Sequence, residues 1–82
     1  MIDKLVSAYA KRVESMTKDC KCASELSFRT QNVFDYCNDV THVIDILYMY
    51  DVIDFYKLCE WENRAEEIRD FSVLQMAERV CK

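Results

Sequence analysis

The sequence predicts an all-α fold, a compact bundle of four to five short amphipathic helices that forms one domain over residues 1–82. Two observations point to this fold. None of the 82 residues is glycine or proline, so tight hairpins and bulges lack the residue that usually supplies their positive backbone dihedral. In addition, apolar residues recur at intervals of three and four along most of the chain, which is the spacing of one face of a helix.

The first predicted helix covers residues 2–16, and a polar connection follows it. Its apolar positions lie three or four residues apart, whereas the charged positions fall on the other face. They are Ile2, Leu5, Val6, Tyr9, Val13 and Met16. Residues 19–27 include several weak helix formers, so we expect the connection there. The hydroxyl of Ser27 then suits the N-cap of the second helix.

The central segment, residues 33–59, is rich in β-branched and aromatic residues, which makes a strand the main alternative to a helix. Strand alternation mixes polar and apolar side chains on both faces, whereas helical spacing separates them. The shared apolar arc consists of Val40, Val43, Ile44, Leu47 and Tyr48. Beyond Tyr50 this arc rotates by roughly 100°. We therefore expect a helix that breaks at about residues 50–52, with Asp51 capping the helix that follows.

A further break is predicted near the end of the chain. Ser72 and Gln75 have the spacing of a capping box, and Phe71 with Met76 fits the hydrophobic staple that accompanies such a box. A short final helix is therefore expected to begin at Val73.

Composition excludes several classes of function. Nucleotide-binding loops of the Walker and dinucleotide types need glycine beside the phosphates, and this chain has none. Hydrophobic residues make up 51% of the chain and charged residues 32%, which predicts a folded protein. The longest uncharged stretch is far shorter than the roughly 20 residues of a membrane span. Residues 1–5 show no export signal, so we expect a cytoplasmic protein without membrane contact.

The formal charge of −4 is unevenly distributed along the chain. Residues 1–34 carry six basic and four acidic side chains, whereas residues 35–67 carry nine acidic and two basic ones, a net charge of −7. Nucleic-acid binding relies on clustered lysine and arginine, so direct binding of nucleic acid is not expected. The acidic block instead favours a protein partner with a basic surface.

Five cysteines without an export signal indicate free thiols rather than a disulfide framework. Cys37, Cys59 and Cys81 lie beside apolar positions at helical spacing, so we expect them to fill the core. The alternative is a small zinc-stabilised structural domain with thiolate and imidazole ligands. Those ligands would be Cys20, Cys22, Cys37 and His42. Their spacing matches no common zinc motif, so we prefer the core interpretation and expect no cofactor.

His42 is the single histidine, and Asp39 and Asp45 lie three residues away on either side, close to it on a helix surface. Acid–base catalysis also needs a pocket, a nucleophile and groups that stabilise developing charge. A bundle of 82 residues has little room for all of these. We therefore expect no enzymatic activity and interpret this face as solvated.

Recognition of another protein is the preferred function. Aromatic residues and methionine are enriched at protein interfaces, and carboxylates around them attract a basic partner. The predicted partner-binding residues are Asp45, Met49, Tyr50, Asp51, Asp54 and Trp61. The second expected partner is another copy of the chain, in a homodimer or homodimeric scaffold. A small, acidic, helical chain without a catalytic motif is similar in type to many virus- or phage-encoded inhibitors and accessory regulators, although no residue motif identifies a family.

Overall fold

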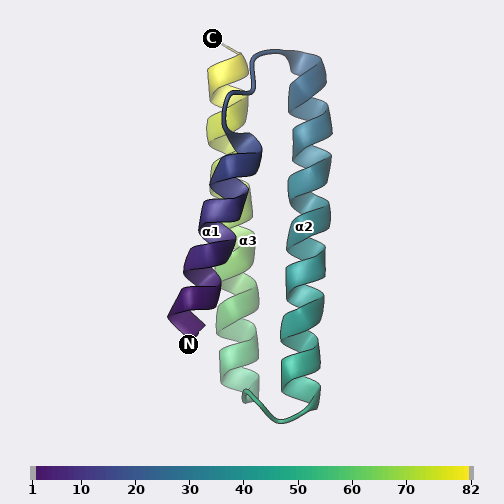
Figure 1. Ribbon diagram of the computed structural model, residues 1–82, viewed down its shortest axis with the longest axis vertical. Helices are drawn as coiled ribbons and strands as arrows, with labels where there is room; N and C mark the ends of the chain where they lie inside the picture. The colour runs from purple at the N-terminus through teal and green to yellow at the C-terminus, as the bar shows by residue number, and fades with distance from the viewer. Residues whose placement is uncertain (1, 82) are drawn as a thin grey trace.

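Three α-helices form an antiparallel bundle in the computed structural model, which describes residues 2–81 (Figure 1). Helix α1 runs from Ile2 to Thr17, α2 from Ala23 to Met49, and α3 from Phe55 to Val80. The two turns lie at opposite ends of the bundle (Figure 1). The all-α prediction is confirmed, whereas the predicted number of four to five helices is wrong. The described part excludes Met1 and Lys82, which belong to the predicted domain. It also excludes the burial of Ile2, which belongs to the predicted first helix.

The core consists of two clusters that follow one another along the bundle. All three helices build the first cluster, while α2, α3 and the turn between them build the second. The first contains Tyr9, Val13, Val33, Cys37 and Ala65, and the second contains Ile44, Ile53 and Trp61. The buried apolar residues of α1, Tyr9 and Val13, therefore belong to the first cluster only, and the end of the α2–α3 hairpin is stabilised mainly by α2 and α3.

Tyr9 fixes α1 against both of the other helices. Its hydroxyl donates a hydrogen bond to the carbonyl oxygen of Ala65 in α3 at 2.8 Å, and its ring stacks on Tyr36 of α2 with the centroids 5.5 Å apart. Burial, and after it the neighbouring Cys37 thiol, raises the pKa of Tyr9 above its ordinary value, so the phenol stays protonated and acts as a donor. These contacts set the level at which α1 lies beside α2.

Aspartate takes the place of glycine in both turns between helices. Asp19 and Asp51 have φ angles of 61° and 60°, in the left-handed region that glycine usually supplies. After α2, the amide of Val52 donates to the carbonyl of Leu47 at 2.9 Å and the amide of Asp51 donates to that of Tyr48 at 3.0 Å, which is the Schellman pattern. Aspartate visits this conformation more readily than most residues. The break predicted at about residues 50–52 is confirmed.

The cap of α3 is Asp54, so the prediction of Asp51 as the cap is wrong. The Asp54 carboxylate accepts a hydrogen bond from the backbone amide of Lys57 at 2.8 Å. Ile53, directly before the cap, is buried in the cluster against which Leu58 packs, as in a hydrophobic staple. Asp51 does not cap α3 because it occupies the left-handed position that ends α2.

Helix α2 begins earlier than predicted, so the first connection covers residues 18–22 rather than 19–27. Cys22 is the N-cap, with an extended backbone at φ −142°. The Glu25 carboxylate in the first turn accepts a hydrogen bond from the amide of Lys21 at 3.0 Å, which satisfies an amide just before the helix. Ser27 lies inside α2, and its prediction as the N-cap is wrong.

Helix α3 passes through Ser72 without the predicted break, so no separate helix begins at Val73. Phe71 is 61% exposed whereas Met76 is fully buried, and the two therefore form no staple. Ser72 is half-buried and lies on the inward face, four residues before Met76. The serine interrupts the apolar pattern of the sequence but leaves the helix intact.

The cysteines differ from one another in burial. Cys37 is 1% exposed and belongs to the first core cluster, as predicted. Cys59 and Cys81 are exposed, so the prediction that they fill the core is wrong. Cys59 lies on the outer face of α3, and Cys81 follows its last turn. Cys20 is buried in the first connection and Cys22 is exposed, and all five thiols are free.

Candidate recognition surface

Exposed apolar side chains gather at the end of the α2–α3 hairpin, which is the lower end of the bundle in Figure 1. They are Met49, Tyr50, Val52, Phe55 and Tyr56, each between 59% and 76% exposed. We call these five residues, together with Asp51 and Asp54, the hairpin-end surface. Contiguous exposed apolar groups of this kind mark interaction sites in soluble proteins.

Local structure fixes this surface on both helices. The turn between α2 and α3 covers only residues 50–54, so the last turn of α2 lies directly beside the first turn of α3. Tyr48 and Phe55 meet across this gap in an edge-to-face arrangement with the centroids 6.0 Å apart. Within the turn, Ile53 points into the second core cluster while Val52 is 59% exposed. The surface is therefore held by two packed helices and does not depend on a long loop.

Four of the predicted partner-binding residues lie together on this surface. Met49 and Tyr50 are 75% and 76% exposed, and Asp51 and Asp54 are exposed between the apolar residues.

Trp61 does not belong to the surface, and its prediction as a binding residue is wrong. It is 6% exposed and packs with Ile44 and Ile53 in the core, because its position on α3 faces inward. The predicted binding residues did not include Val52, Phe55 and Tyr56. A signal for them was available. Val52 is an apolar residue in a short turn, and Phe55 lies in the first turn of a helix whose inward face is filled by other side chains.

Asp45 lies before the hairpin-end surface and faces Glu62 of α3. Burial raises the pKa of Glu62 to about 7, and the contact with the Asp45 carboxyl and the charge of Glu66 add to the rise. The Glu62 carboxyl thus holds a proton close to neutral pH, and its ionisation places two negative charges against one another across the helix pair.

The alternative zinc ligands do not come together. Cys22, the N-cap of α2, and Cys37 within α2 are separated by roughly 22 Å along the helix axis. Cys37 is buried whereas His42 is exposed. Cys22 instead contacts the hydroxyl of Ser24 at 3.2 Å, and this hydrogen bond lowers the pKa of its thiol. Within residues 2–81, no three histidine, cysteine, aspartate or glutamate side chains gather in a metal-binding arrangement.

The surface around His42 is solvated. His42, Asp39 and Asp45 are all exposed on α2. The structure therefore places the histidine and its two carboxylate neighbours on an open helix face, as the sequence indicated.

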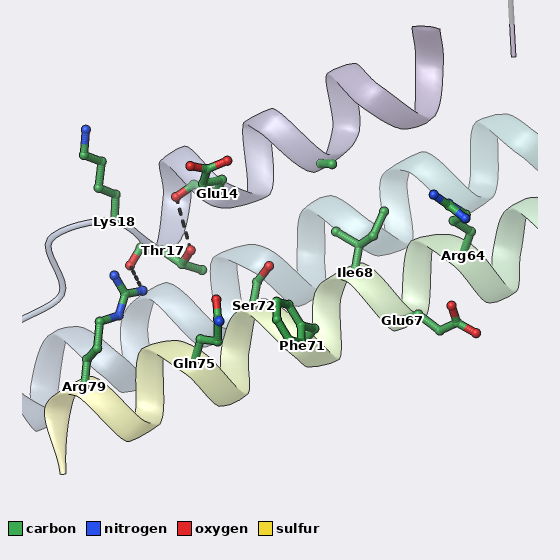
Figure 2. Close-up of a pocket in the computed structure, with 11 residues that line it drawn as sticks. Glu14, Thr17, Lys18, Arg64, Glu67, Ile68, Phe71, Ser72, Gln75 and Arg79 are labelled. Atoms are coloured by element: carbon green, nitrogen blue, oxygen red, sulfur yellow. Dashed lines mark hydrogen bonds between the residues drawn. The ribbon is translucent and has the colours of Figure 1, made fainter. Parts of the chain in front are cut away.

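A wide groove of about 910 Å³ lies along one side of the contact between α1 and α3, and Figure 2 shows its lining. At one end Arg79 donates a hydrogen bond to the carbonyl of Thr17 at 3.2 Å, and the Thr17 hydroxyl donates to the carbonyl of Glu14 at 3.2 Å (Figure 2). Glu67 and Arg64 line the other end. Because both signs of charge alternate and the arginine is engaged in holding α1, this groove presents no uniform surface to a ligand.

The fold and the surface define a small three-helix bundle with an end that is both apolar and acidic. No protein family, curated protein or solved structure matches this chain. In the part of the chain that the structure describes, none of the helices has the length and apolar character needed to cross a membrane.

Proposed function

We propose that this protein acts by binding another protein, as an inhibitor or accessory regulator, and that its hairpin-end surface recognises a basic surface of that partner. The observation that supports this proposal is the placement of five exposed apolar side chains around Asp51 and Asp54 at one end of the bundle.

The apolar part of the surface is large enough to contribute to binding. Tyr50, Phe55 and Tyr56 are 76%, 63% and 75% exposed. At about 200 Å² for a whole aromatic side chain, they offer roughly 400 Å² to a partner. Burial of that area is favourable by about 10 kcal/mol, which is similar to the general cost of association. Apolar contact alone therefore gives weak binding, and a tight complex needs further contacts.

The carboxylates supply such contacts and select the partner. The block from residue 35 to residue 67 has a net charge of −7, and Asp51 and Asp54 are exposed and lie among the exposed apolar residues in the sequence. A negative surface accelerates encounter with a basic partner and suppresses binding to acidic proteins. Because both carboxylates are exposed, their effect falls as salt increases.

The test uses immobilised protein to capture partners from lysate of the source cells. The charge variant is Asp51→Asn with Asp54→Asn, because asparagine tolerates the left-handed conformation and also caps helices. The apolar variant is Tyr56→Ala. Its matched control is Phe28→Ala, which removes an aromatic side chain that is 69% exposed near the start of α2, at the other end of the bundle.

We expect the unmodified protein and Phe28→Ala to capture the same basic protein, and moderate salt to release it. Tyr56→Ala and the double asparagine variant should lose it while their helical circular dichroism is unchanged. Equal capture by all four proteins, or capture that salt does not weaken, contradicts the proposal.

A further inference from the structure

The α1–α3 groove has an exposed aromatic ring near its middle and charged side chains at both ends (Figure 2). Phe71 supplies the ring and is 61% exposed, while Ile68, one turn earlier on α3, is half-buried in the lining. Leu74 follows Phe71 on the outer side of α3 and is 59% exposed. The lining starts at Ala10 of α1 and at Arg64 of α3, so packed helices form both walls. Aromatic residues in such positions are enriched where proteins contact one another.

Charges of both signs balance on this surface. We call the groove, together with Leu74 and Glu78, the α1–α3 face, since Glu78 is exposed two turns after Phe71 on the same side of α3. Its charged side chains are equally divided between acidic and basic: Glu14, Lys18, Arg64, Glu67, Glu78 and Arg79. At its edges Asp70 pairs with Arg69 at 2.9 Å, and Lys11 is exposed on α1. The face is close to neutral, whereas the whole chain has a formal charge of −4, so a second copy meets little repulsion here.

The order of the charges along α3 is self-complementary. Arg64 precedes Phe71 by seven residues and Glu78 follows it by seven, so all three lie on one side of the helix at intervals of about two turns. A second α3 that runs antiparallel, centred on Phe71, has its Glu78 opposite Arg64 and its Arg64 opposite Glu78. A parallel α3 would set arginine against arginine and glutamate against glutamate. Charge therefore selects a second, antiparallel copy as the occupant of this face.

Glu67 is compatible with the same arrangement. It lies four residues before Phe71, so it comes level with Gln75 of the other copy. Gln75 lines the groove, and its amide group offers N–H donors to a carboxylate. Glu67 also lies three residues after Arg64 on the same helix. Arg64 thus stands between two carboxylates, Glu67 of its own copy and Glu78 of the other.

Helix α1 adds charges near the centre of the face. Glu14 lines the groove opposite the stretch from Ser72 to Gln75 (Figure 2). The two Glu14 carboxylates of an antiparallel pair approach one another there. Lys11 and Lys18 lie about one turn to either side of each Glu14, and their positive charges offset this repulsion.

The area of the face suits a weak complex. From Arg64 to Arg79 the face is about 22 Å long, and two adjacent helices make it about 20 Å wide. These dimensions give roughly 450 Å² per copy, or roughly 900 Å² for the pair, which is the size of transient complexes. We therefore expect a dissociation constant on the order of 100 µM.

We propose that two copies of this chain associate through their α1–α3 faces, antiparallel, with Phe71 at the centre and Arg64 of each copy beside Glu78 of the other. The contact on α3 begins at Arg64, so the hairpin-end surface lies outside it, and the two hairpin ends lie at opposite ends of the pair. The association requires no other protein and uses no residue of the hairpin-end surface. It therefore stands or fails independently of the proposed function.

The test is analytical ultracentrifugation of the full chain from about 5 to about 1,000 µM, with a reductant present because Cys22, Cys59 and Cys81 are exposed. We expect the mass to rise from 9.8 kDa towards twice that value as concentration increases. Phe71→Asp should raise the dissociation constant at least tenfold. Phe28→Asp is the matched control, because Phe28 is 69% exposed on α2, outside the α1–α3 face, and it should leave the constant unchanged.

A charge exchange tests the orientation. Arg64→Glu should raise the dissociation constant about fivefold, because two exposed ion pairs become repulsive. Addition of Glu78→Arg to the same chain should restore the original constant, which a parallel pair does not predict. A mass of 9.8 kDa at every concentration overturns the proposal and leaves the face to another protein. Equal association of the Phe71 and Phe28 variants, or a double charge variant that associates no better than Arg64→Glu, overturns it as well.

Discussion

Glu62 makes the stability of the bundle depend on pH in a direction that is unusual for a carboxyl group. Its pKa rises from 4.5 to about 7 in the folded chain, so between these values the folded state holds a proton that the unfolded state has released. Stability therefore decreases as pH rises from about 4.5 to about 7. Removal of the charge by Glu62→Gln should stabilise the protein above pH 7 and have little effect below pH 4.5.

The size of this effect follows from the pKa and the position of the side chain. A rise from 4.5 to about 7 corresponds to about 3 kcal/mol if the carboxyl is fully shielded from water. Glu62 is only half-buried and Asp45 is exposed, so water screens their repulsion. We therefore expect Glu62→Gln to be more stable than the unmodified protein by about 1 kcal/mol at pH 8.

The assay is urea unfolding at pH 4.5, 6, 7 and 8, followed by the fluorescence of Trp61, which is 6% exposed in the folded chain. The difference between variant and unmodified protein cancels the titration of groups that both share. Glu67→Gln is the control, because Glu67 is exposed in the α1–α3 groove, away from Asp45. A stability difference for Glu62→Gln that stays constant from pH 4.5 to pH 8 would refute the reasoning.

Four substitutions test the packing and the turns by chemical unfolding at pH 7. Tyr9→Phe should cost about 1 kcal/mol, because it removes the buried hydrogen bond to Ala65; no loss would show that this bond does not hold α1. Asp54→Ala should lower the free energy of unfolding by about 1 kcal/mol, because α3 loses its cap. Asp51→Gly should leave stability equal or higher, since glycine relieves the left-handed backbone. A loss of stability for Asp51→Gly but not for Asp54→Ala would show that Asp51 is the cap. Trp61→Ala should cost about 3–5 kcal/mol and unfold much of the chain, and a loss below 1 kcal/mol would contradict its burial.

The sequence was sufficient to predict the helical class, because the spacing of its apolar residues and its composition both indicate that the backbone favours a helix locally. The absence of glycine and proline and the spacing of Val40, Ile44 and Leu47 lead to the same conclusion, and α2 is helical throughout. The break near residue 51 also followed from a local signal, the rotation of the apolar arc.

The number of helices could not be predicted because one polar residue on a buried face looks like an interruption. Ser72 has the spacing of a capping box, but the inward stripe continues through it to Met76, and only the packing against α1 and α2 reveals this. The same limitation applies to Trp61. Its residue type favours an interface, while the facing positions of Ile44 and Ile53 place it in the core.

The candidate surface was partly predictable for a related reason. Met49, Tyr50, Asp51 and Asp54 lie within one short stretch of sequence, so their joint exposure follows from a turn at that point. The level at which α1 lies beside α2 depends on the stacking of Tyr9 on Tyr36 and has no local signature.

Recognition through the hairpin end is tested most directly by a chemical-shift map of the labelled protein during titration with its captured partner. We expect the amide signals of residues 49–56 to shift or broaden first and most strongly. Signals of the α1–α3 groove and of the region around Phe28 should change little. Changes confined to the groove or to the Phe28 end, with residues 49–56 unaffected, would contradict recognition by this surface.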